Sequence, residues 1–110
     1  EATIDVVCGH NDAEVVGAYN AAVAQGRKEI KFIGIAGDID VLGWLADGNE
    51  MWLAEVLQDP VVLGYQATDA MYKVLVLKEE LPEKYDLPEP EAITKDNIKD
   101  YDWQNWGWLG

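Results

Sequence analysis

The sequence predicts an α/β fold of Rossmann-like type, in which a parallel sheet is flanked by helices as three αβα layers. Short apolar runs alternate three times with segments whose apolar residues recur at helical spacing, and turn residues separate each segment from the next. Strand-helix units in this order form parallel sheets with right-handed crossovers. The chain of 110 residues, 49% of them hydrophobic, is long enough for one core and no more.

The first unit begins with residues 4–8, an apolar run that holds one Asp and ends in a turn. Residues 11–25 then carry apolar side chains at helical spacing, and Gly26 is the stop signal. The second unit repeats this order, with a strand over residues 30–35 and a helical segment that ends at Asp47. Two units in the same order favour two neighbouring parallel strands.

The third unit consists of a strand over residues 51–57 and a helix from Pro60 to about residue 78. Asp59 is expected to cap this helix, with Pro60 at its first position. The apolar side chains of the helix share one side, which carries Leu63, Ala67, Met71, Val74 and Leu77.

The last part of the chain, from residue 79, differs in character, because its prolines exclude another long helix. Three tryptophans gather near its end. These tryptophans are Trp103, Trp106 and Trp108. They could stack on sugar rings, but we expect them to pack over a groove of the protein.

The charge balance argues against nucleic acid as a partner. Eight Lys and Arg against 21 Asp and Glu give a formal net charge of −13, and such a field repels phosphate backbones and anionic lipid headgroups. No apolar run approaches the roughly 18 residues of a membrane span, and the first residues lack the features of a leader peptide. Because the chain starts without Met and enters a core strand at once, we expect a fragment of a longer protein.

The residues of common catalytic sites are missing, and the sequence predicts no enzymatic activity. It has no Gly-x-Gly-x-x-Gly or Gly-Lys-Ser/Thr loop, no serine, no Cys/His zinc pattern and no calcium loop. Cys8 and His10 lie two residues apart, but Cys8 is expected to be a buried, inert core thiol. We therefore expect no cofactor and no metal.

Polar side chains follow each of the three strands, at the sheet edge where ligands of parallel α/β folds bind. Asn11 fits a helix-capping box with Glu14, and it equally fits a ligand residue if Asp12 caps the helix instead. We predict the second arrangement. A hydrogen bond from the backbone N–H of Ala13 or Glu14 to the Asn11 side chain would rule out a ligand role.

Asp38 and Gln58 follow the second and third strands. Asp38, with Asp40, is explained by helix capping, by acceptance from a ligand hydroxyl, by phosphate transfer or by a cation site, and capping is favoured. Gln58 has no capping role because Asp59 supplies it, so ligand contact is its favoured explanation.

Five segments carry a family resemblance: Cys-Gly-His-Asn-Asp-Ala-Glu at 8–14, Gly-Arg-Lys-Glu-Ile-Lys-Phe-Ile-Gly-Ile at 26–35, Asp-Gly-Asn-Glu at 47–50, Leu-Gln-Asp-Pro with Gly64 at 57–64, and Thr-Lys-Asp-Asn-Ile at 94–98. In this order and spacing they resemble the C-terminal half of type I periplasmic binding proteins, in the branch of ribose-binding-like sugar receptors of bacterial ABC importers. The resemblance runs from residue 4 to about residue 101.

The resemblance implies a solute receptor whose two α/β lobes are joined by three hinge strands and enclose the ligand. Residues 1–58 would be part of the C-terminal lobe, residues 59–82 a helix that crosses to the other lobe, and residues 83–110 the returning hinge with a Trp-rich tail. Most of the N-terminal lobe would then be missing. The implied location is periplasmic or extracellular. The implied partners are a sugar or polyol, an ABC permease, and the N-terminal lobe or a second copy of the chain.

By the same resemblance, Asn11 and Gln58 bind sugar hydroxyls. The family's third ligand residue is the Asp of Gly-Phe-Asp-Gly, and this chain has Ala36 in its place, in Gly34-Ile35-Ala36-Gly37. Asp38 is then a displaced substitute, and the ligand need not be a simple pentose or hexose.

Two rival functions use related folds. The alternative is the effector-binding core of a lactose-repressor-type regulator, although such regulators also need a DNA-binding headpiece. A flavodoxin-like or phosphoreceiver domain that uses Asp38 or Asp40 is disfavoured, because no acidic residue ends the first strand and no Lys follows the third.

Overall fold

The sheet of this computed structural model has three parallel strands and an antiparallel fourth, in the order β1-β2-β3-β4. The structure describes residues 3–82 and 90–105. The strands are β1 (Val6–Cys8), β2 (Lys31–Ala36), β3 (Trp52–Leu57) and β4 (Ala92–Ile93). The predicted α/β fold with a parallel sheet is therefore confirmed.

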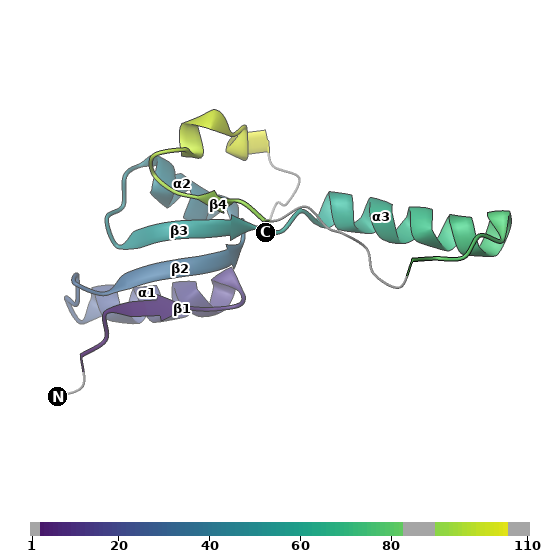
Figure 1. The fold of residues 1–110 in the computed structure, drawn as a ribbon. Coiled ribbons are helices and arrows are strands. Elements are labelled where there is room, and N and C mark those ends of the chain that lie inside the picture. The colour runs from purple at the N-terminus through teal and green to yellow at the C-terminus, as the bar shows by residue number, and fades with distance from the viewer. Residues whose placement is uncertain (1–2, 83–89, 106–110) are drawn as a thin grey trace.

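Two helices connect the parallel strands. Helix α1 (Asp12–Ala24) joins β1 to β2, and α2 (Ile39–Ala46) joins β2 to β3; both lie behind the sheet in Figure 1. Right-handed crossovers between strands that follow one another across a sheet place both helices on the same face. Two short 3₁₀ turns, η2 (Ile98–Asp100) and η3 (Trp103–Asn105), pack against α2.

The core lies between the sheet and these helices. Its centre is an aromatic cluster in which Tyr19 of α1 meets Phe32 of β2, Trp44 of α2 and Trp52 of β3, with ring centroids 4.8 to 5.9 Å apart. Phe32 and Trp52 are fully buried, so each side chain removes a large apolar surface area from water. This cluster fixes both helices against the sheet.

The second helical layer of the predicted αβα sandwich is not found in the part of the chain that the structure describes. Alternate side chains of the strands therefore face outward uncovered: Val7 of β1 is half-buried, while Val6 and Cys8 on either side of it are exposed. The prediction that Cys8 is a buried core thiol is wrong for this reason. Ile35 and Leu53 are likewise exposed on β2 and β3.

Helix α3 (Pro60–Tyr72) and the π-helical turn η1 (Lys73–Leu77) form an arm that projects from the sheet, as Figure 1 shows. No side chain of either element is buried. The radius of gyration is 17.6 Å, whereas a compact chain of this length has about 13 Å. None of the described helices is long and apolar enough to span a membrane.

Candidate functional site

The carboxyl ends of β1, β2 and β3 lie at one edge of the sheet, and the three predicted ligand residues follow them. Asn11 comes three residues after β1, Asp38 two residues after β2, and Gln58 directly after β3. The Gln58 backbone N–H donates to the Ala36 carbonyl at 3.0 Å, which ties the last two connections together. Parallel pairing thus brings three separate segments to the same edge.

Asn11, not Asp12, caps helix α1. The Asn11 Oδ1 accepts a hydrogen bond from the Ala13 N–H at 2.9 Å, and the Asn11 backbone is extended as an N-cap requires. The prediction that Asp12 is the cap is therefore wrong, and the bond that argues against a ligand role for Asn11 is present. Its Nδ2 group makes no hydrogen bond within residues 3–82 and 90–105, so a donor remains at this exposed position.

The two predicted aspartate caps are confirmed. Asp38 Oδ1 accepts from the Asp40 N–H at 3.0 Å at the start of α2. Asp59 accepts from the N–H groups of Val61 and Val62 at 2.9 and 3.0 Å at the start of α3. Each carboxylate accepts hydrogen bonds from backbone N–H groups of the first turn that have no partner within the helix. This explains why α2 and α3 begin directly after Asp38 and Asp59.

Gln58 is exposed, between the end of β3 and the cap of α3. Its side chain has no hydrogen-bond partner in the described part of the chain. An amide in this state offers both a donor and an acceptor to a ligand. Of the three predicted residues, Gln58 is the one whose side chain has no structural duty here.

Directly beneath this edge lie two buried carboxyl groups, Asp12 at 2% and Glu55 at 0% exposure. Asp12 Oδ2 accepts from the N–H groups of Gly37 and Asp38 at 3.1 and 2.8 Å. Glu55 Oε1 accepts from Ala36 and Gly37 at 3.0 Å each. The two carboxyls together therefore hold the backbone of residues 36–38, the connection that carries Asp38.

The environment of Glu55 favours its protonated form. Burial, then the neighbouring Asp12 charge and a hydrogen bond with Asp12, raise the pKa of Glu55 from 4.5 to about 8, against the opposing bonds from Gly37 and Trp52. The Trp52 indole N–H donates to Glu55 Oε2 at 3.4 Å. Below about pH 8 this edge is thus built on a neutral acid beside Asp12.

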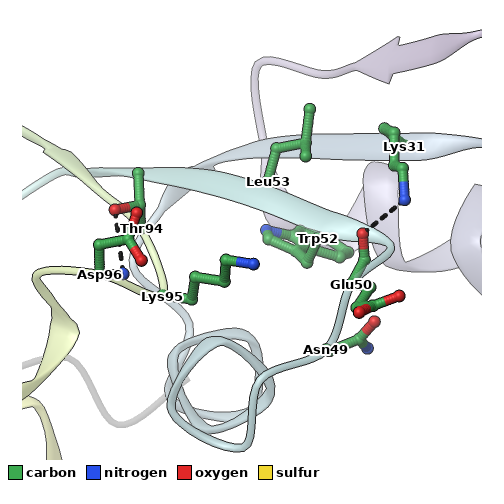
Figure 2. Close-up of a pocket in the computed structure, with 8 residues that line it drawn as sticks. All are labelled: Lys31, Asn49, Glu50, Trp52, Leu53, Thr94, Lys95 and Asp96. Carbon is green, nitrogen blue, oxygen red and sulfur yellow. Dashed lines mark hydrogen bonds between the residues drawn. The ribbon is translucent and has the colours of Figure 1, made fainter.

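A pocket of about 390 Å³ lies elsewhere, at the starts of β2 and β3. Figure 2 shows Lys31 reaching across to the Glu50 carbonyl, a bond of 2.8 Å. The pocket contains none of the three predicted ligand residues, since strands that run parallel have their carboxyl ends at the other edge. It is lined by Lys31, Asn49, Glu50, Trp52, Leu53, Thr94, Lys95 and Asp96.

Within residues 3–82 and 90–105, no group of three or more His, Cys, Asp and Glu side chains could hold a metal ion. Trp103 packs against the core, as expected for that residue, while Trp106 and Trp108 lie outside the described residues. His10 pairs with Glu14 at 3.1 Å on the surface. None of these contacts assembles a catalytic group.

Comparison with known proteins decides the class. No family model matches the chain. The L-arabinose-binding periplasmic protein of Escherichia coli K12 is 28% identical over 97 residues, which cover 86% of this chain and 30% of that protein. An ABC transporter solute-binding protein from Agrobacterium vitis, solved with bound allitol, matches with a TM-score of 0.77 and 31% identity over 88% of this chain and 33% of that one. The chain is a partial homologue of sugar ABC transporter periplasmic solute-binding proteins.

This homologue spans about a third of the length of the binding proteins it matches. A myo-inositol-binding protein of Caulobacter matches with a TM-score of 0.70 and 26% identity. The match includes 89% of this chain and 32% of that protein. The relatives are solute-binding proteins and not enzymes, in agreement with the sequence prediction. Their match also agrees with the predicted fold class.

The predicted site residues leave out the buried pair, which sequence reasoning missed. The signal was present: Glu55 is the only charged residue in the strand Trp-Leu-Ala-Glu-Val-Leu, and a charge in a buried strand needs partners. Asp12 was assigned to capping, although its carboxylate in fact reaches another connection. The backbone N–H groups of Ala36, Gly37 and Asp38 are the common hydrogen-bond donors of both carboxyls, which the sequence alone did not reveal.

Proposed function

We propose that this binding-protein homologue forms one side of a sugar or polyol site in a solute receptor of an ABC importer. The observation that carries the proposal is the likeness to the allitol-bound receptor, at 31% identity and a TM-score of 0.77 over 88% of this chain. Allitol is an open-chain polyol, and the other relatives include proteins solved with myo-inositol and glycerol. The proposed ligand is therefore a neutral molecule that carries several hydroxyl groups.

Residues 1–58 are proposed to belong to the C-terminal lobe, residues 59–82 to cross to the other lobe, and residues 83–110 to contain the returning hinge. The exposed arm supports this division. A helix with Val61, Met71 and Leu75 at 57 to 62% exposure has an apolar surface that a second lobe would cover. Strand β4 supports the return, because it runs back antiparallel to β3.

The ligand would contact this edge of the sheet, at the carboxyl ends of the strands, through Gln58 and the carboxylate of Asp38. Gln58 is the stronger of the two, since its amide has no partner in the described part of the chain. Within the same residues, Asp38 has one oxygen, Oδ2, left beyond its capping bond. Closure of a second lobe over this edge would exclude water and strengthen each hydrogen bond.

This edge has one carboxylate fewer than the family pattern, because Ala36 stands where that pattern has an Asp. The buried Glu55 carboxyl accepts the hydrogen bonds of the Ala36 and Gly37 N–H groups from below. The edge therefore offers fewer ionic acceptors to a ligand than a connection with an exposed Asp would. This favours ligands that do not need a bidentate carboxylate acceptor. Delivery to a permease and a periplasmic location complete the proposal, and both follow the names of the relatives.

A thermal-shift screen tests the function at the full encoded length of the protein. The panel contains allitol, myo-inositol, glycerol, L-arabinose and furanose sugars, with nucleotides and a phosphodonor as the opposing set. Stabilisation by a member of the first set is expected. No response to the first set with a response to the second would overturn the proposal in favour of a receiver-type domain.

Gln58→Ala is expected to weaken the ligand found in that screen. Loss of one or two hydrogen bonds in a closed cleft costs about 1 to 3 kcal/mol, or roughly five- to 150-fold in Kd. Gln25→Ala is the matched control, because Gln25 is exposed at the end of α1, away from this edge. Isothermal titration calorimetry measures both. Equal affinities of the two variants would remove Gln58 from the site.

A further inference from the structure

Gly34 lies under the two buried carboxyls and shows how close they are. A Cβ at Gly34 would collide with Asp12 Oδ1 and Glu55 Oε2, so both oxygens approach the same point above this residue. Within the described residues, Asp12 Oδ1 is buried and has no hydrogen-bond partner. Two ionised carboxylates at this separation would repel each other strongly in a site that excludes water.

Within the described residues, no cation pairs with the two carboxyls. His10 and Glu14, near the start of α1, pair with each other on the surface. Lys31 lies at the opposite end of β2, where its ammonium group donates to the Glu50 carbonyl. The remaining titratable groups on the packed elements are Cys8 of β1, Tyr19 of α1, and Asp38 and Asp40 at the start of α2. Asp38 adds a further negative charge nearby. No ion pair of the described part of the chain reaches Asp12 or Glu55.

We propose that Asp12 and Glu55 share a single proton, with Glu55 Oε2 donating to Asp12 Oδ1, and that this proton locks the Ala36–Asp38 connection at the carboxyl edge. In the locked state the outer oxygens, Asp12 Oδ2 and Glu55 Oε1, accept the four backbone N–H bonds of this connection. Glu55 is thus a positioning residue for Asp38. The inference concerns the folded chain itself and holds whether or not the proposed ligand site is correct.

The direction of the pH effect follows from linkage. Glu55 holds its proton more tightly in the folded chain, where its pKa is about 8, than in the unfolded chain, where it is 4.5. The stability that this group contributes is therefore fully present below about pH 4.5 and is lost as the pH rises through about 8. The folding equilibrium constant falls by up to about tenfold per pH unit in that interval.

Carbon-detected NMR of the 110-residue chain measures the proton directly. The Glu55 carboxyl signal is expected to titrate near pH 8, and the amide signals of Ala36, Gly37 and Asp38 should shift with the same midpoint. The Gly48 amide, which donates to the Leu45 carbonyl at the other edge, is the internal control and should not follow it. A Glu55 midpoint near 4.5 would overturn the proposal.

Variants give a second, independent measurement by urea unfolding between pH 5 and 9 at constant ionic strength. In Glu55→Gln the amide keeps both roles, accepting from the connection and donating to Asp12, so its stability should lose the extra pH slope. Glu50→Gln makes the same substitution at an exposed position and should keep the wild-type slope. Equal slopes in the two variants would contradict the shared proton, and a variant that fails to fold leaves the NMR titration to decide.

Discussion

Some residues of this chain are required for contacts that cannot be read from their spacing in the sequence. Gly34 is the clearest case, because the two carboxyls occupy the space where its side chain would be. Its absence of a Cβ is a packing requirement, not a turn requirement, since its φ is not in the left-handed region. The buried pair and the glycine are therefore one unit of structure.

Gly34→Ala is expected to destabilise the chain by about 1 to 3 kcal/mol, the usual cost of overpacking a close-packed interior. Gly17→Ala is the matched control: its Cβ would meet no atom within 4 Å, and it lies within α1. Alanine there should stabilise the helix by about 0.5 to 1 kcal/mol. Urea unfolding at pH 6 compares the two. A Gly34→Ala variant as stable as wild type would mean that the carboxyls are further apart than the structure has them.

Cys8 and Glu55 show which features of single residues could be predicted from the sequence and which could not. The apolar run 4–8 predicts a strand, and its last three residues, Val6–Cys8, form one, but the sequence does not tell which of the two faces is covered. Cys8 lies on the uncovered face and so is exposed. Glu55, by contrast, was detectable as a charge in an apolar strand, but its partners come from α1 and the β2–α2 connection, which only the fold brings together.

At the scale of elements, boundaries follow from local chemistry. Asp38 and Asp59 were predictable as caps because a cap needs only its own helix. Helix α1 begins at Asp12, one residue earlier than a cap at Asp12 would place it, because Asn11 is the cap. The predicted helix over residues 60–78 is α-helical only to Tyr72; the π-helical turn η1 follows, and Lys78 ends it in the left-handed region at φ 58°.

The arm formed by α3 and η1 is expected to be the least stable helical element of the isolated chain. No side chain is buried along it, and a 13-residue helix is marginal in water without packing. Asp59→Ala, which removes the cap of Val61 and Val62, should speed amide exchange across α3 by about fivefold, equivalent to about 1 kcal/mol. Asp96→Ala, with the same loss of charge at an exposed position, is the control. Exchange in α3 as slow as in α1 would show that another surface covers the arm.

The whole molecule combines a highly charged body with an arm whose formal net charge is zero. Residues 60–77 contain one Asp and one Lys, Asp69 and Lys73, which pair at 2.7 Å. The formal net charge of −13 therefore belongs to the rest of the chain. The arm carries most of the large exposed apolar side chains: Val61, Val62, Leu63, Tyr65, Met71, Tyr72, Leu75, Val76 and Leu77.

This separation predicts self-association of the isolated chain through the arm, as a dimer or a domain swap, because apolar patches of this kind rarely stay in water. Sedimentation should show a dimer that Met71→Glu dissociates. Val23→Glu, which places the same charge on an exposed valine of α1, should leave it intact. A reducing agent is required, since Cys8 is exposed and could form a disulfide between chains. Because the charged bodies repel each other, raising the salt from about 0.1 M to 1 M shortens the screening length from about 10 to 3 Å and should strengthen the dimer. A wild-type chain that stays monomeric at high concentration and high salt would contradict an unpartnered arm.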